Sequence, residues 1–190
     1  MTSQYPRSDA YFAAVASNFQ ALQTLSPLIE RAAQMLTDAV RRGNKVMFCG
    51  NGGSAADSQH LAAELMGRYL KERNPMPAIA LTTDTSALTA IGNDYGFADV
   101  FVRQLRGLGR KGDGLVAIST SGNSENVVRA VTAANEIGIA TIALTGQGGG
   151  KLRELADIAI CVPAKQTNHI QEMHIAIGHY LCGFIEQAAS

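Results

Sequence analysis

Histidine and acidic side chains that can bind a metal or move protons recur at helical spacing in this chain. Asp57, His60, Glu64 and Arg68 are three, four and four residues apart, which places them on one stripe of a helix. His60 and Glu64 can put an imidazole nitrogen and a carboxylate on one divalent metal, as zinc sites do. An isolated pair of this kind is more often a solvated face, here with a Glu64–Arg68 ion pair. A metal site therefore needs further ligands from elsewhere in the chain.

The last helical segment offers candidates for those ligands. Its apolar side chains form a core stripe made of Ile170, Met173, Ile177, Leu181 and Phe184. His174 lies on that stripe, so we expect a packed histidine there. His179 lies on the opposite side, together with Gln171 and Glu172. If this second face is also buried, His179 is a metal ligand, an acid–base group or a hydrogen-bonded core histidine.

A glycine-rich turn, "CGNGGSAADSQH", follows the first apolar run and opens a helix. Gly50, Gly52 and Ala55 formally match a dinucleotide-binding fingerprint, and Asp84 stands where a ribose contact would be sought. The pattern is short, and we favour a contact to a sugar or a phosphate. The remaining alternative is a tight turn in which Ser54 caps the helix.

A second turn, "STSGNSENV", carries four hydroxyl side chains within six positions: Ser119, Thr120, Ser121 and Ser124. It follows another apolar run and precedes a helical segment. Ser124 is placed to cap that helix. The exposed N–H groups and the dipole of a helix N-terminus also bind anions, so the turn is a candidate phosphate cradle.

The elements that must position these residues follow a strand–helix–strand pattern. The strands are continuous apolar runs, as expected for strands buried on both faces, at 45–50, 77–82, 114–119, 140–145 and 157–163. Helical stretches such as 54–70 and 124–137 lie between them. We therefore predict an α/β fold with a five-stranded parallel sheet between two helical layers. Right-handed crossovers would bring the loops after the strands to one sheet edge, where such sheets bind ligands.

The chain is expected to form a single domain over residues 1–190. Residues 1–43 are a helical extension, with two helices separated near Ser26 and Pro27, and residues 44–190 form the core and a long final helix. Sixteen Lys and Arg balance sixteen Asp and Glu, which argues against a nucleic-acid partner. No apolar run is long enough to span a bilayer. Three cysteines without a CxxC motif and no signal-peptide pattern predict a cytoplasmic protein.

Several strings resemble the phosphoheptose isomerase family of sugar isomerase (SIS) domain enzymes. They are "CGNGGSAADSQHLAAELMGRY", "AIGNDYGF", "ISTSGNSENVVRA", "ALTGQGGG" and "IQEMHIAIGHYL". The resemblance runs from about residue 10 to the C-terminus and implies the SIS fold, a three-layer αβα sandwich. It also implies a homotetramer with shared active sites. The implied reaction converts sedoheptulose 7-phosphate to a heptose 7-phosphate for bacterial surface glycans such as lipopolysaccharide.

The resemblance also assigns roles to individual residues. The implied ligands of one Zn²⁺ are His60, Glu64, Gln171 and His179. The implied sugar contacts are Asn51, Gly52, Gly53, Glu64, Asn93, Asp94 and Gln171, and the phosphate would be held by Ser119, Thr120, Ser121 and Ser124. For the chemistry we expect Glu64 to be the base and His179 the complementary acid.

Two alternatives share the SIS scaffold. A replication initiator-associating protein has several of the same strings but lacks the Glu at 64 and the His at 179. Retention of His60, Glu64, Gln171 and His179 together therefore favours an enzyme. A sugar-phosphate sensor would bind ligand without chemistry. One position departs from the isomerase pattern: Asn168 stands where relatives often have an Asp, which leaves a hydroxyl contact without its charge.

Overall fold

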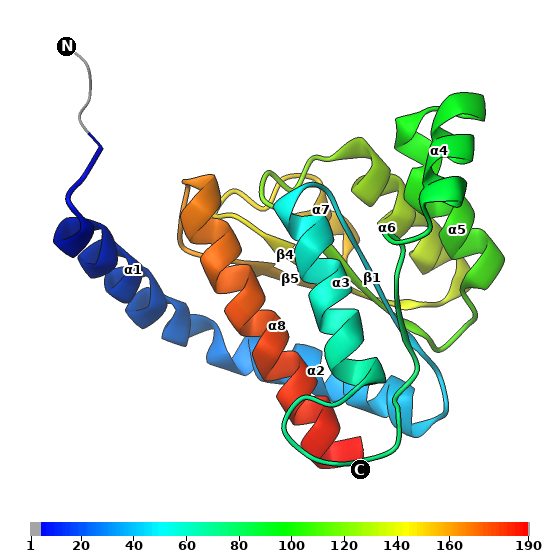
Figure 1. Ribbon diagram of the computed structural model, residues 1–190, viewed down its shortest axis with the longest axis horizontal. Helices are drawn as coiled ribbons and strands as arrows, with labels where there is room; N and C mark the ends of the chain where they lie inside the picture. Colours follow the sequence, from blue (N-terminus) through cyan, green and yellow to red (C-terminus); the bar gives the residue numbers. More distant parts are fainter. Residues whose placement is uncertain (1–4, 190) are drawn as a thin grey trace.

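Five parallel strands form the centre of the molecule, shown in Figure 1 as a computed structural model that describes residues 5–189. Their order across the sheet is β2-β1-β3-β4-β5, and every neighbouring pair is parallel. The strands are β1 Val46–Gly50, β2 Ala78–Ala80, β3 Gly114–Ser119, β4 Ala140–Thr145 and β5 Ile158–Cys161. The predicted fold class is confirmed. The two edge strands, β2 and β5, pair on one side only and are shorter than their apolar runs.

The helices follow the strand–helix alternation expected from the sequence. They are α1 Ser8–Leu22, α2 Ser26–Arg41, α3 Gly53–Met66, α4 Thr85–Asp94, α5 Val100–Leu108, α6 Glu125–Ile137, α7 Leu152–Leu155 and α8 Thr167–Ala189, with 3₁₀ turns η1 Gln23–Leu25 and η2 Phe97–Asp99. Pro27 stands in the first turn of α2, as predicted. No helix among the described residues is long and apolar enough to cross a membrane.

Alternate residues of the strands point to opposite faces of the sheet and pack into two separate hydrophobic cores. Phe48, Val116 and Leu144 pack with α2, α3 and α8, whereas Met47, Leu115 and Ala143 pack with α5, α6 and α7. The predicted core stripe of α8 faces the first of these cores. Since α2 belongs to that same layer, the N-terminal extension is partly built into the sandwich.

Two helices of the same layer, α3 and α8, lie side by side and run in the same direction (Figure 1). Gly178 allows this close approach, because a Cβ there would come within 2.5 Å of the Leu61 side chain. The next residue along α8 is His179, and the residue before Leu61 is His60. The packing therefore sets the two histidines opposite each other.

The helix predicted to extend to residue 70 ends at Met66, so Arg68 lies beyond it and the expected Glu64–Arg68 helix pair does not form. The loop that follows is tied to the end of α8 by a buried carboxylate. Glu186 accepts hydrogen bonds from the backbone N–H groups of Tyr69, Leu70 and Lys71 at 2.8–2.9 Å. It also pairs with Arg73 at 3.1 Å, and the two side chains are 2% and 4% exposed. Polar contacts thus replace the last turn that the sequence pattern predicted.

This buried pair generates a prediction about stability. Burial alone would raise the pKa of Glu186, but the three N–H donors and Arg73 hold that pKa below its ordinary value. Glu186→Gln should cost about 3 kcal/mol of unfolding free energy at neutral pH, because it leaves Arg73 buried without its charge partner. Denaturant unfolding would measure the loss. The matched control is Glu136→Gln, which breaks an exposed ion pair with Arg106 and should cost less than about 1 kcal/mol.

The sign of the pH dependence follows from the lowered pKa. Glu186 stabilises the fold fully above the ordinary glutamate pKa of about 4.3, and this contribution is lost as the pH falls through the lower folded pKa. The difference in unfolding free energy between the natural protein and the Glu186→Gln variant should therefore become smaller at acidic pH. An equal cost for Glu186→Gln and Glu136→Gln at neutral pH would contradict the assignment.

Candidate metal and substrate site

Three side chains from α3 and α8 converge on one point. The Nε2 atom of His60 lies 3.1 Å from Nε2 of His179 and 3.0 Å from Oε1 of Glu64. One ligand atom from each of the three residues lies within 4.8 Å of the others. Two imidazoles and a carboxylate are a donor set that suits zinc, and three protein ligands with a fourth position open are typical of catalytic zinc sites. The side chains present therefore fit the metal that the sequence resemblance implies.

Gln171, the remaining predicted ligand, lies at a different height on α8. Its amide touches the start of α3, where a Cβ on Gly53 would come within 2.7 Å of Gln171 Nε2. Eight residues of helix separate it from His179, which is about 12 Å along the axis. The structure thus brings Gln171 to the glycine turn, and three of the four predicted ligands to one another.

Asp57 belongs to the same face of α3, one turn before His60, but was not among the predicted site residues. Its Oδ2 atom is buried and has no hydrogen-bond partner among the described residues. Burial raises the pKa of this carboxyl, while the nearby His60 and His179 act to lower it. The sequence feature that could have identified Asp57 is its position on the predicted polar stripe of α3. A buried carboxylate oxygen without a partner, facing two histidines, is an acceptor for a ligand hydroxyl or for a metal-bound group.

The hydroxyl turn after β3 forms the second part of the site. The Ser119 Oγ atom lies 2.9 Å from Ser124 Oγ and 3.5 Å from Ser121 Oγ. Ser124 holds the N-cap position of α6, as expected, yet its side chain makes no cap hydrogen bond there. Because its hydroxyl turns toward Ser119, the sequence prediction of a side-chain cap is wrong. Three hydroxyls gather instead before the first turn of α6, where an anion would also meet backbone N–H groups.

The glycine turn after β1 lies next to the hydroxyl turn. Asn51 and Asn126 exchange two amide hydrogen bonds of 2.8 and 2.9 Å, which link the end of β1 to the start of α6. Gly52, with φ at +54°, is the N-cap of α3. Ser54 is therefore inside the helix, buried, and is not the cap. No pattern in the sequence pointed to Asn126, because the amide pair joins turns from two different strands.

Asn93 and Asp94 are not brought to this cluster. They end α4, are exposed, and hydrogen-bond to each other at 2.8 Å. Figure 1 shows α4 at the side of the sandwich, away from α8. Asp84, which the dinucleotide alternative needed as a ribose contact, instead caps α4 by accepting from Ala87 N at 2.9 Å.

The start of α8 holds a further polar group. Asn168 donates to the Tyr11 hydroxyl at 3.1 Å, and that hydroxyl bonds to Glu172. Glu172 also pairs with His169 at 2.9 Å. The neutral residue at 168 thus contacts the N-terminal helix. His174, by contrast, is fully buried, and burial lowers its pKa to about 4, as fits the packed, neutral histidine expected there.

Known proteins share this arrangement over nearly the whole chain. A model of the SIS domain matches residues 10–146. The chain is 58% identical to a phosphoheptose isomerase of Akkermansia muciniphila over 173 residues, which covers 91% of this chain and 92% of that protein. It is 59% identical over 179 residues to a phosphoheptose isomerase of Rhodospirillum rubrum, covering 94% and 95% of the two chains.

Solved structures agree with these sequence matches. The phosphoheptose isomerase of Neisseria gonorrhoeae superposes with a TM-score of 0.89 at 48% identity, over 94% of this chain and 96% of that one. A phosphoheptose isomerase from Francisella tularensis gives a TM-score of 0.90 at 40% identity, with the same coverage.

Proposed function

Because the chain belongs to the phosphoheptose isomerase family of SIS-domain proteins, we propose that it converts D-sedoheptulose 7-phosphate to D-glycero-D-manno-heptose 7-phosphate. The observation that carries this proposal is the convergence of His60, Glu64 and His179 on adjacent helices. The glycine turn opens α3, and the hydroxyl turn that precedes α6 lies beside it at the strand ends, where a phosphorylated sugar would bind.

The reaction moves one proton between C1 and C2 of the sugar through an enediolate. We assign Glu64 as the base, since its carboxylate is part of the cluster and its side chain is only 23% exposed. We assign His179 as the complementary acid; it would give a proton to the sugar oxygen from a ring nitrogen that is not bound to the zinc. A zinc ion held by these side chains would supply positive charge for the oxyanion that develops.

The metal assignment includes one side chain outside the cluster. His60, Glu64 and His179 would hold the zinc through two ring nitrogens and a carboxylate oxygen. The family resemblance supports Gln171 as the fourth ligand. The Gln171 amide lies over Gly53. To bind the zinc, this side chain would have to leave that contact and point toward the histidines. In its present position Gln171 would contact the sugar between the phosphate and the reacting carbons.

The phosphate would bind at the hydroxyl turn. The close grouping of the Ser119, Ser121 and Ser124 hydroxyls supports this, with Thr120 in the same turn. No lysine is required, because hydroxyl and N–H donors at a helix start bind phosphate. Asn51, Gly52 and Gly53 of the neighbouring turn would contact the sugar.

The alternatives have less support. A replication initiator-associating protein has no need for Glu64 and His179, yet both belong to the cluster. A sensor would need the hydroxyl turn but not the metal-binding group. We also propose a cytoplasmic location and a role in bacterial surface glycan synthesis. The three free cysteines support the location, and cell fractionation would test it.

For the proposed reaction, the first prediction concerns turnover and metal. Purified protein should isomerise sedoheptulose 7-phosphate, contain about one zinc per chain, and lose turnover on chelation. Glu64→Gln should lower kcat by about 10²- to 10⁴-fold, as expected for a lost general base. Glu72→Gln, a matched change at an exposed glutamate beyond α3, should leave kcat unchanged. Full activity of Glu64→Gln would rule out the assigned base.

A second prediction concerns the phosphate. Ser119→Ala should mainly raise KM, because it removes a hydroxyl that contacts a part of the substrate away from the reacting carbons. Thr132→Ala removes an exposed hydroxyl from the same helix region and should change neither constant. Steady-state kinetics on both variants is the measurement. An unchanged KM in Ser119→Ala would return this turn to a purely structural role.

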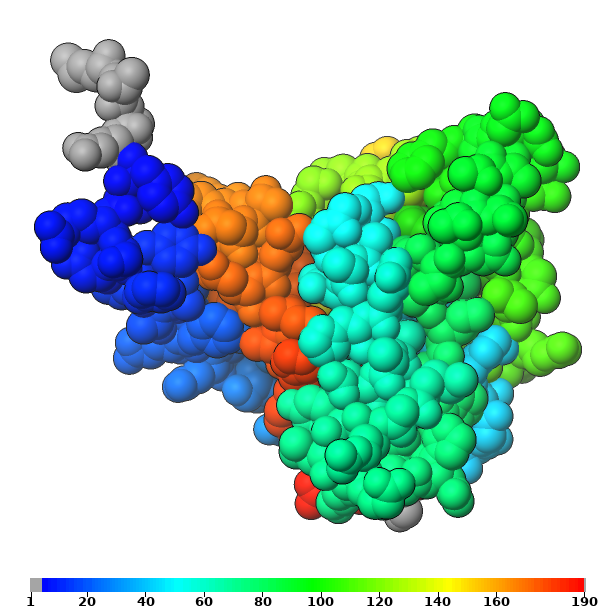
Figure 2. Space-filling model, in the orientation of Figure 1, coloured from blue at the N-terminus to red at the C-terminus, as the bar shows by residue number. Residues whose placement is uncertain are grey.

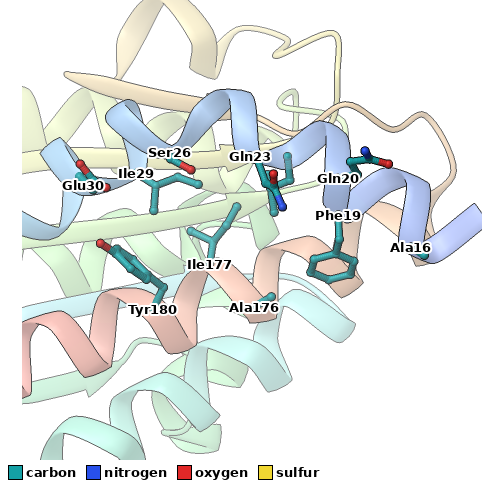
Figure 3. A pocket seen from close by; sticks show the side chains of 11 residues that line it. Ala16, Phe19, Gln20, Gln23, Ser26, Ile29, Glu30, Ala176, Ile177 and Tyr180 are labelled. Atoms are coloured by element: carbon teal, nitrogen blue, oxygen red, sulfur yellow. The ribbon is translucent and has the colours of Figure 1, made fainter.

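The resemblance also implies a homotetramer with shared active sites, and an apolar groove supports association between copies. The groove, about 470 Å³, lies between α8 and the α1–α2 region (Figure 3). Phe19, Ile29, Ile177 and Tyr180 point into it. The space-filling view shows α1 projecting from the body (Figure 2). We propose that helices of a second copy fill the groove, and that Asn93 and Asp94, remote from this chain's cluster, serve a neighbouring copy.

Ala16→Arg, which puts a charge in that groove, should shift the protein to smaller species in sedimentation velocity. Thr132→Arg, at an exposed position of α6, is the control and should keep the natural mass. A monomeric natural protein would contradict the proposal, as would an Ala16→Arg variant of unchanged mass.

A further inference from the structure

An aromatic ring outside the cluster covers one side of His179. The ring of Tyr69 is stacked on the imidazole, with centroids 5.7 Å apart and planes 22° from parallel. The His60 ring meets the same imidazole edge-on at 4.9 Å. The His179 imidazole thus contacts two rings, of which one belongs to the cluster and the other to the loop after α3.

The backbone of that loop is fixed to the helix that carries His179. Glu186 follows His179 by two turns of α8, and its Oε1 atom accepts from Tyr69 N at 2.9 Å. Its Oε2 atom accepts from the next two backbone N–H groups. Since Glu186 is buried, water does not compete for these bonds. The tyrosine ring and the histidine ring are therefore held by the same helix.

Arg73 links this arrangement to the other half of the cluster. Its Nε atom donates to Glu186 at 3.1 Å, and its Nη2 atom donates to the backbone carbonyl of Glu64 at 2.8 Å. A further bond from Nη1 reaches Leu65 O at 2.9 Å. One buried guanidinium thus connects the last turns of α3 with α8 and with the loop that carries Tyr69.

We propose that Tyr69, anchored by the buried Arg73–Glu186 pair, is a positioning residue that holds the His179 imidazole for the isomerase reaction. This inference rests on the proposed function. An imidazole on a partly exposed helix face can rotate about its outer side-chain bond. A ring stacked on it removes that freedom, as the groups that orient metal-binding and acid–base histidines do. The stacking depends on the aromatic ring and not on the hydroxyl, so a phenylalanine at this position should hold the imidazole as the tyrosine does.

The test compares Tyr69→Leu with Tyr69→Phe. Tyr69→Leu should lower kcat by about 10- to 100-fold, the usual cost of losing an orienting group. KM should stay within about two-fold, because the phosphate contacts are untouched. Tyr69→Phe should retain most of the natural kcat. Glu72→Ala, an exposed side chain in the same loop, is the control and should match the natural protein.

A second measurement does not depend on turnover. Ring protons of His179, identified by their loss in His179→Gln, should be shifted upfield by the stacked ring in the purified protein. Tyr69→Phe should keep this shift, and Tyr69→Leu should lose it. If the natural protein showed no isomerase activity, the proposed function would fail, and the ring shift would still decide the positioning role.

Any of three results would overturn the inference. One is a Tyr69→Leu variant with kcat within about two-fold of the natural value. Another is an equal loss in Tyr69→Phe and Tyr69→Leu, which would assign the effect to the tyrosine hydroxyl. An unchanged His179 ring shift in Tyr69→Leu would likewise show that the stacking does not exist in solution.

Discussion

The direct packing of α3 against α8 is the contact on which the site depends. Gly178 removes the side chain that would separate the helices, and Leu61 fills the space. Since the helices run in the same direction, residues at matching heights meet in order. Gln171 contacts Gly53 at the N-terminal ends of the two helices, near the sheet edge. His179 contacts His60 further toward the C-terminal ends, where the loop that carries Tyr69 also packs against α8. One helix contact thus arranges a row of polar groups along its length.

The sheet supplies the other constraint. Parallel strands end at one edge, so the turns after β1 and β3 are neighbours although more than sixty residues separate them in the chain. The Asn51–Asn126 amide pair fixes their spacing. A phosphate held by hydroxyls at the start of α6 would leave the rest of a seven-carbon sugar to extend toward α3 and α8. The distance between anchor and reacting carbons is then set by a rigid framework, as substrate positioning requires.

Polar groups are distributed unequally between support and function. Glu186 and Arg73 are fully paired, which makes the region below the cluster rigid. Asp57 has a buried oxygen without a partner, and the hydroxyls of the serine turn bond mainly to one another. Unsatisfied buried groups cost stability unless a ligand completes them. Among the described residues, the unmet hydrogen bond of Asp57 thus lies on the side where a ligand is expected.

Much of this could be predicted from the amino-acid sequence. Apolar runs located the five strands, because strands buried on both faces lack alternation. Helical spacing put His60 beside Glu64 and put His179 opposite the core stripe. Motif strings identified the family. These features depend on local periodicity or on similarity to known motifs, and both can be identified from the order of residues alone.

Other features were decided only by tertiary structure. The sequence pattern predicted that α3 extends to residue 70. The helix ends at Met66, and the loop after it bonds to Glu186 and Arg73. Ser124 was expected to cap α6, yet its hydroxyl turns to Ser119. Asn126 and Tyr69 lie within the quoted strings, but nothing in those strings pointed to their partners, which lie 75 and 110 residues away. Spacing along the chain determines which side chains share a face. Which faces meet depends on how closely the backbones can pack, and that is settled when the whole core forms.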